Sequence, residues 1–165
     1  MGAENLSSLL WHERNLLDLL TFKLETEQLL LTAGKSKWLQ HASLEVEQVV
    51  NKLREAGLAR TVATSSVALE WGVDEHASLA QLAAAAPSAG PWGELLRSHL
   101  EAMTVQAAHI REVRDANEQF LRVAARSSQE TMSTLQPENG TYDSHGAASS
   151  GLVSAGGGHL FDKEL

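Results

Sequence analysis

The sequence predicts an all-α fold: an elongated antiparallel helical bundle or coiled coil with two long helices, a small helical cap and a disordered C-terminal tail. Hydrophobic residues form 43% of the chain but aromatic residues only 5%, so the apolar content is mostly Leu, Ala and Val, a composition typical of packed helices. No proline precedes Pro87, which permits long helices before it. No segment alternates apolar and polar residues as a strand does.

A leucine stripe predicts a helix over about residues 4–31. Its members recur at steps of three and four residues, the 3.5-residue period of a coiled coil. They are Leu6, Leu10, Leu17, Leu20, Leu24 and Leu31, with Glu13 and Glu27 completing the series. A second stripe runs from Leu39 to Ala56, and the spacing between Leu31 and Leu39 shifts the seam by one residue. We expect a bend or kink at Gly34 rather than a full break.

The middle of the chain is predicted to form shorter helices. Gly57 is suited to cap the second stripe, and the helix after it is expected to end near Gly72. Another short helix opens with the acidic pair at 74–75 and stops before Pro87. Pro91 is well placed to begin the last helix, which we expect to reach about Gln136. A helix of about 45 residues is roughly 68 Å long, so the bundle should be elongated.

Glycine content divides the chain into two parts. Six of the 12 glycines follow Pro137, within the last 29 residues. Such a segment buries too little apolar surface to offset the entropy lost on ordering. The prediction is a helical domain over residues 1–136 and a flexible Gly-rich tail over residues 137–165.

Composition excludes several classes of protein. The formal net charge is −8, whereas a nucleic-acid-binding domain shows a basic surface. The chain has no cysteine, which excludes disulfides and thiolate metal sites and is compatible with a reducing compartment. No apolar run is long enough for a membrane span, and the N-terminus does not resemble a signal peptide. We expect a cytoplasmic protein without membrane insertion.

The motifs that could indicate an enzyme are weak. Gly34-Lys35-Ser36 lacks the earlier glycine and the preceding strand of a phosphate-binding loop. The seven histidines form no Glu-x-x-His or His-x-x-x-His pair. Asp143-Ser144-His145 are consecutive in the predicted tail, where nothing orients them as a catalytic triad. We therefore predict neither an enzyme nor a cofactor or metal site.

The stripes predict apolar surface that the bundle itself does not cover. The N-terminal stripe is wide, and two helices cannot bury all sides of it, so a second copy or a partner helix is expected to cover the rest. Asn117 lies on the seam of the last helix, where a polar residue fixes register or contacts a partner. Tyr142 is the only tyrosine, and an isolated aromatic residue on a flexible segment is suited to anchor a partner.

Several short motifs, in order, resemble the flagellar export chaperones for the hook–filament junction proteins, the FlgN-like family. The chain opens with Leu-x-x-Leu-Leu-x-x-Glu-x-x-x-Leu-x-x-Leu over Leu6 to Leu20, followed by Leu29-Leu30 and Lys52-x-x-x-x-x-Leu58-Ala59-Arg60. Ser78-Leu79-Ala80-Gln81-Leu82 follows, then Asn117-Glu118-Gln119-Phe120-Leu121. Thr141-Tyr142-Asp143-Ser144-His145-Gly146 is similar to the family's Tyr-Asp-x-x-Gly ending. The resemblance covers about residues 5–146.

The resemblance implies a cytoplasmic chaperone of flagellar type III export. Such proteins bind the C-terminal amphipathic segments of hook-associated proteins 1 and 3, prevent their premature assembly and deliver them to the export gate. It implies client binding on the late helix, here by Ile110, Val113, Asn117, Phe120, Leu121 and Ala124. It also implies docking on the cytoplasmic domain of the export gate through Tyr142. Homodimerisation of the free protein remains open, and the competing interpretation is a self-associating coiled-coil adaptor with no export role.

Overall fold

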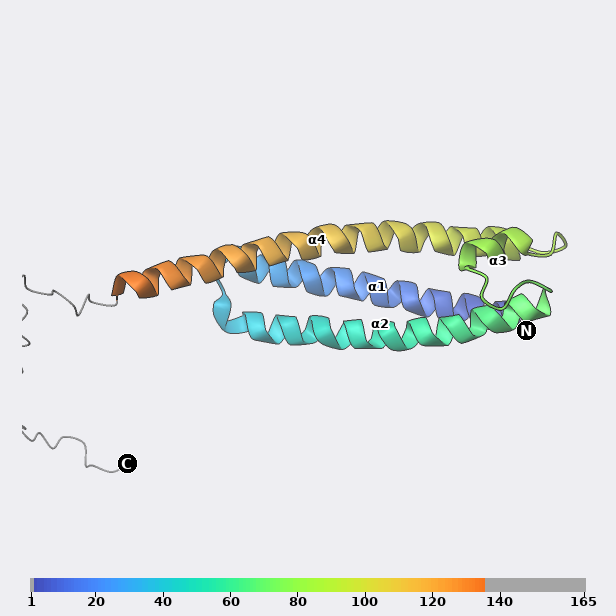
Figure 1. Ribbon diagram of the computed structural model, residues 1–165, viewed down its shortest axis with the longest axis horizontal. Coiled ribbons are helices and arrows are strands. Elements are labelled where there is room, and N and C mark those ends of the chain that lie inside the picture. Colours follow the sequence, from blue (N-terminus) through green and yellow to red (C-terminus); the bar gives the residue numbers. More distant parts are fainter. Residues whose placement is uncertain (1, 136–165) are drawn as a thin grey trace, which may run out of the picture.

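The computed structural model describes residues 2–135, which form four helices (Figure 1). α1 spans Gly2–Thr32, α2 spans Ser36–Glu70, α3 spans Leu79–Ala85 and α4 spans Trp92–Leu135. No strand occurs within the described residues. The all-α class, the elongated antiparallel bundle and the short cap helix are therefore confirmed. The tail predicted over residues 137–165 lies outside the described part of the chain.

The chain reverses direction at Gly34, so the prediction of a bend or kink within one long helix was wrong. Gly34 has a φ of 64°, in the left-handed region that ends a helix. The amide of Lys35 donates a 2.9 Å hydrogen bond to the Leu30 carbonyl, which satisfies one of the last carbonyl groups of α1. α2 then returns along α1, so the bundle has three long helices rather than two.

α2 continues through Gly57, which the sequence had suggested as a helix end. Gly57 lies inside the helix, and α2 ends at Glu70. Ala56 and Ala63 on either side of it are buried against α1, so packing outweighs the cost of about 1 kcal/mol for an internal glycine. The predicted end near Gly72 is confirmed, since Gly72 has a φ of 69° directly after the helix.

α1 is the middle helix of the three long ones (Figure 1). α2 runs antiparallel to it, as shown by the 2.7 Å ion pair of Arg60 with Glu13 and the 2.8 Å ion pair of Lys23 with Glu45. α4 runs parallel to α1, because its early and late residues contact early and late residues of α1 respectively. No Cα atom of α2 lies within 8 Å of a Cα atom of α4. Each outer helix is therefore held mainly by α1.

Two apolar clusters hold the bundle together. The larger one lies at the cap end and brings together Leu6, Leu10, Val67, Leu82 and Leu96, all fully buried, from all four helices. The smaller one joins Leu20 and Leu24 of α1 to Val49 of α2 and Val113 of α4. Burying a leucine or valine side chain contributes about 1.5–3 kcal/mol, so the leucine stripe of α1 is the main source of stability.

The cap is organised by a short, well-terminated helix. Ser78 and Gln81 form a capping box, in which the Ser78 hydroxyl accepts from the Gln81 amide and the Gln81 side chain accepts from the Ser78 amide. The helix therefore begins at Leu79, later than the acidic pair at 74–75 had suggested. α4 begins at Trp92, one residue after Pro91, whose carbonyl accepts a bond from Leu95.

A histidine is buried among these apolar residues. His99 of α4 is fully buried, with the hydroxyl of Ser7 at 3.4 Å from Nε2 and the guanidinium of Arg14 at 3.5 Å from Nδ1. Because arginine only donates hydrogen bonds, Nδ1 accepts here and Nε2 carries the proton. Burial and then the charge of Arg14 lower the pKa of His99 below its usual value of 6.5. The ring is therefore neutral at physiological pH.

The lowered pKa of His99 predicts a loss of stability in mild acid. Below pH 6.5 the unfolded chain binds a proton at this residue that the folded protein does not bind, so stability decreases as the pH falls toward the lowered pKa. We expect the melting temperature to fall by a few degrees between pH 7.5 and pH 5.5. Circular dichroism melts should show a smaller decrease for His99→Gln. His12→Gln changes an exposed histidine and should keep the full decrease; equal pH profiles for all three proteins would contradict this account.

Candidate functional site

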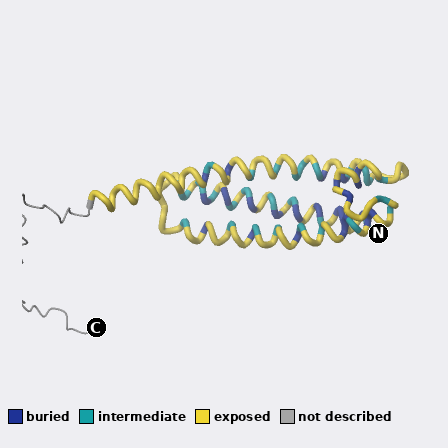
Figure 2. Tube along the Cα trace, in the orientation of Figure 1, coloured by how far each residue is buried: buried dark blue, intermediate teal, exposed yellow. Residues whose placement is uncertain are grey.

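One face of α4 packs on α1 and then continues beyond it. The residues of this face recur at steps of three and four along the helix. Asn117 is the last residue of α4 that forms a hydrogen bond with α1. Every residue from Glu118 to Thr134 is exposed (Figure 2). We call residues 118–135 of α4 the overhang; at 1.5 Å per residue it is about 27 Å long. The same face is thus covered in one half of α4 and uncovered in the other.

A buried polar cluster marks the point where this covering ends. The carboxylate of Glu27 on α1 accepts hydrogen bonds from Ser43 on α2 at 2.6 Å and from Asn117 on α4 at 3.1 Å. Asn117 also donates to the Leu24 carbonyl at 2.9 Å and is only 2% exposed. Because a buried carboxylate requires hydrogen-bond donors, these contacts fix how the three helices align just below the overhang.

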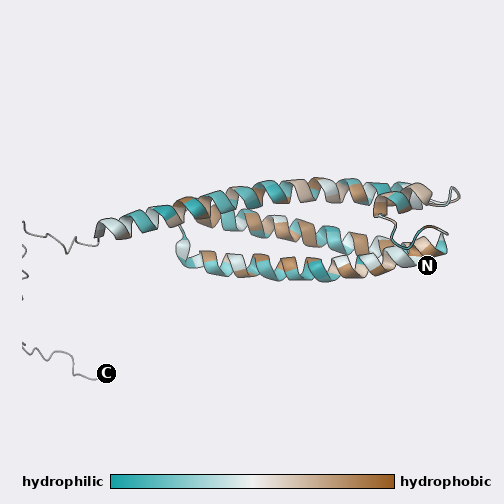
Figure 3. Cartoon of the chain, in the orientation of Figure 1, coloured by the Kyte–Doolittle hydropathy of each residue, from teal (hydrophilic) through white to brown (hydrophobic). Residues whose placement is uncertain are grey.

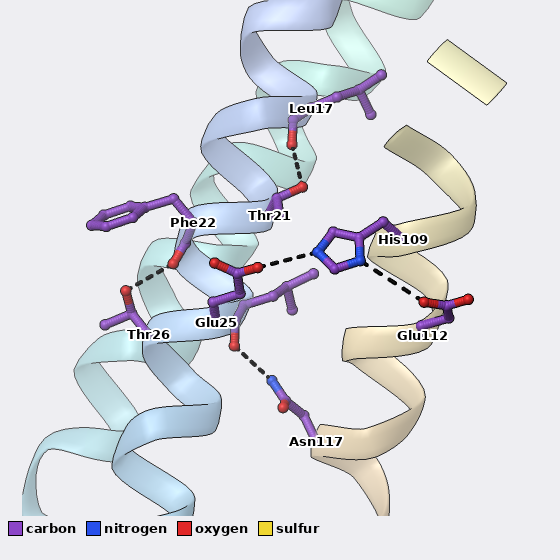
Figure 4. A network of polar contacts seen from close by, with 9 residues as sticks. Leu17, Thr21, Phe22, Glu25, Thr26, His109, Glu112 and Asn117 are labelled. Atoms are coloured by element: carbon purple, nitrogen blue, oxygen red, sulfur yellow. Dashed lines mark hydrogen bonds and ion pairs between the residues drawn. The ribbon is translucent and has the colours of Figure 1, made fainter. Parts of the chain in front are cut away.

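Exposed polar contacts run along the edge of the α1–α4 contact (Figure 4). His109 of α4 lies 3.1 Å from Glu25 of α1 and 3.9 Å from Glu112 of its own helix. All three side chains are about half-exposed or more, so these pairs contribute little to stability. Asn117 lies one to two turns further along α4 and points inward at the backbone of α1 (Figure 4).

The first turns of the overhang carry apolar side chains among polar ones (Figure 3). Phe120 and Leu121 are 43% and 40% exposed, whereas Val123 is 69% exposed. Phe120 and Val123 line a shallow hollow together with Ala116 and Gln119. Further along, Met132 is 72% exposed among hydroxyl-bearing residues. An uncovered apolar face of this kind is suited to bind an amphipathic helix.

The six residues expected to bind a client fall into two groups. Ile110, Val113 and Asn117 lie within the covered half, where the first is partly buried and the other two are buried against α1. Phe120, Leu121 and Ala124 lie on the overhang and are exposed. Tyr142, expected to dock on the export gate, lies outside the described residues.

Several residues at this end of the molecule were not singled out as functional from the sequence. Glu27 was recognised only as a seam position, and its partner Ser43 had no distinguishing signal. Val123 is one residue before the predicted Ala124 but shares the hollow with Phe120. Leu29 and Trp38, on either side of the α1–α2 turn, are 69% and 52% exposed. Trp38 is adjacent to Leu39 of the second stripe and Val123 to the predicted Ala124, a signal that could have identified these two residues. Leu29 lies two residues from both Glu27 and Leu31, so its position gives no such signal.

Two further hollows within residues 2–135 have a more polar lining. They lie where the connection after α2 folds back on it, beside polar side chains such as Arg60, Glu75 and His76. Among residues 2–135, no three His, Asp or Glu side chains gather as metal ligands would. Over the same residues, no helix is both long and apolar enough to cross a bilayer. The arrangement is suited to bind a helix on the apolar part of α4.

Comparison with known proteins agrees with the geometry. A family model described as FlgN protein matches residues 1–150, which include all four helices. No curated protein and no solved structure matches the chain. The match covers most of the sequence and agrees with the resemblance found in the short motifs. The chain therefore belongs to the FlgN family, a family of flagellar export chaperones.

Proposed function

We propose that this protein is a cytoplasmic chaperone of flagellar type III export that binds hook-associated proteins 1 and 3. It holds their C-terminal amphipathic segments, prevents their premature assembly and delivers them to the export gate. The observation that supports this most directly is the uncovered apolar face of α4 at the start of the overhang. Such a face is suited to bind an amphipathic client helix.

The client helix is proposed to pack on Phe120, Leu121 and Ala124. These residues continue the face that α1 covers further back, so a client helix there would extend the bundle in the same packing mode. Ile110, Val113 and Asn117 are proposed to contribute to client binding because they hold α4 on α1 and so set the direction of the overhang.

This binding mode also favours release. A client segment that is disordered alone becomes helical on the overhang, and part of the interaction free energy is used to order it. The interface can then be specific without being tight, as transfer to an export machine requires. Docking on the cytoplasmic domain of the export gate is proposed for Tyr142, separately from client binding.

The outer face of α2 favours a second candidate function, a self-associating adaptor with no export role. Leu58, Val62 and Leu69 recur there at helical spacing and are 70%, 72% and 64% exposed. Pairing of two such faces would give a homodimer through α2, which leaves the overhang free.

Light scattering with a C-terminal segment of hook-associated protein 1 or 3 separates the two functions. We expect the full-length protein to form a one-to-one complex with the segment and to melt at a higher temperature in its presence, because the segment binds only the folded state. A dimer whose mass and melting temperature are unaffected by either segment would favour the adaptor.

Phe120→Ala should weaken client binding more than it lowers stability. Phe120 is 43% exposed in the free protein, so truncation removes little packing, whereas a buried aromatic anchor in the complex contributes at least about 2 kcal/mol, or about 30-fold in Kd. Isothermal titration and urea unfolding measure the two effects.

Asn117→Ala is the matched contrast to Phe120→Ala. It removes a donor from buried Glu27, so we expect a loss of about 1–3 kcal/mol in the free energy of unfolding. If Phe120→Ala instead loses stability as Asn117→Ala does and keeps its client affinity, Phe120 belongs to the core of the bundle and the client site is elsewhere.

Tyr142→Ala should leave client affinity unchanged and reduce docking on the gate, because a single exposed aromatic side chain is proposed to be the anchor. A pull-down with the purified cytoplasmic domain of the gate measures docking, and titration with the client segment is the control. Equal recovery of the mutant and the wild-type protein by the gate domain would show that another residue is the anchor.

A further inference from the structure

Acidic residues are absent around the α1–α2 turn. The chain has no Asp or Glu between Glu27 and Glu45, although it carries 21 acidic residues in total. The same segment contains Lys35 and Lys37, which are exposed on either side of the start of α2. The turn is therefore locally cationic in a protein of formal net charge −8.

The overhang shows the same bias after its first residue. Glu130 is the only acidic residue between Glu118 and the end of α4, whereas Arg122 and Arg126 are both exposed. Arg122 forms an ion pair with Glu118, one turn earlier on the helix. Within residues 2–135, neither Arg126 nor the two lysines of the turn form an ion pair at all. Their charges are available to a partner.

These cations lie at the end of the bundle that bears the uncovered apolar face. Asn117 contacts Leu24 and Glu27, so α4 passes the end of α1 within the next two turns, and the α1–α2 turn lies at that level (Figure 1). Lys37 lies over the ring of Trp38 at 5.2 Å, so the turn contributes apolar as well as charged surface. The apolar residues of the overhang thus lie at the same end of the bundle as the cations of the overhang and of the α1–α2 turn.

The opposite end of the bundle has the opposite charge. Glu4, Glu70, Asp74, Glu75, Glu94 and Glu101 lie around the cap, in the first turns of α1, at the end of α2 and in the first turns of α4. Arg97 is the only Lys or Arg in residues 61–110. The excess of acid is therefore concentrated away from the overhang, and the net charge of the whole chain is a poor guide to what the overhang binds.

We propose that the partner helix bound by the overhang carries acidic side chains beside its apolar stripe, facing Lys35, Lys37 and Arg126. This inference rests on the proposed client-binding function and specifies the chemistry of the client. The apolar stripe of the client packs on Phe120 and Val123, which line the same hollow, so that its carboxylates face Arg126, about one turn beyond Val123, and the two lysines of the turn. Exposed pairs of this kind each have a small effect, but together they select the partner and its orientation and increase the rate of association.

The test uses the full-length protein and the C-terminal segments of hook-associated proteins 1 and 3. Each segment is compared with a version in which its Asp and Glu residues are replaced by Asn and Gln. We expect the neutralised version to bind roughly tenfold more weakly at low salt. The difference should shrink between about 50 mM and about 500 mM NaCl, because exposed charges are screened.

Changes on the chaperone complete the test. Lys35→Gln, Lys37→Gln and Arg126→Gln together should abolish the preference for the acidic segment, with an unchanged melting temperature because all three side chains are exposed. Arg97→Gln is the matched control, since it removes an exposed cation at the cap, and it should keep the preference.

The outcomes distinguish this inference from the function on which it rests. Binding of both segment versions with equal affinity, or an unchanged preference in the triple variant, would overturn the acidic-client inference and leave the chaperone function intact. Failure of both natural segments to bind would overturn the chaperone function, and the inference with it. A change in the mass of the free protein caused by the triple variant would assign the cationic end to a second copy of the chain and overturn the inference as well.

Discussion

The stability of the bundle depends on the burial of one leucine stripe of α1 from two sides. α2 covers one flank of this helix and α4 the other, while α2 and α4 do not approach each other closely. A single pair of helices would leave part of the stripe in water, at a cost of about 25 cal/mol for each Å² of apolar surface. The reversal at Gly34 solves this problem, because it lets the second stripe of the chain fold back on the first.

Buried polar groups then determine how the helices align along this stripe. Glu13 pairs with Arg60, and Glu27 accepts hydrogen bonds from Ser43 and Asn117. Apolar contacts alone tolerate sliding of one helix along another, whereas a buried carboxylate without its donors is strongly unfavourable. The carboxylate of Glu27 therefore relates the register of all three long helices, and α4 leaves the bundle at a defined residue.

Much of this structure could be predicted from the sequence, and the exceptions have physical causes. The leucine period of residues 6–31 indicated a long helix with an apolar stripe, which the structure confirms. The bend predicted at Gly34 was wrong because the one-residue shift of the seam is compatible with both a kink and a reversal. Only the covering of α1 by α2 decides between them. The continuation of α2 through Gly57 similarly depends on tertiary packing, which the helix propensity of a single residue does not indicate.

The candidate site shows the same limitation. Asn117 and Phe120 lie three residues apart on α4, and nothing in their spacing indicates that the first is buried against α1 and the second exposed. The end of α1 is set by Gly34, a residue far away in the sequence. The point at which α4 becomes uncovered thus follows from the relative lengths and register of two helices, which cannot be read from either helix alone.

The unequal lengths of α1 and α4 also impose a scale on any helix that binds the overhang. Within the described residues the free part of α4 comprises residues 118–135, about 27 Å or five helical turns. The last residues of α1 still lie beside the first turns of the overhang, since Asn117 contacts Leu24 and Glu27 and α1 continues to Thr32, so only the later turns lie wholly beyond α1. The residue at which α1 ends therefore determines where a bound partner helix can begin to pack on this face of α4.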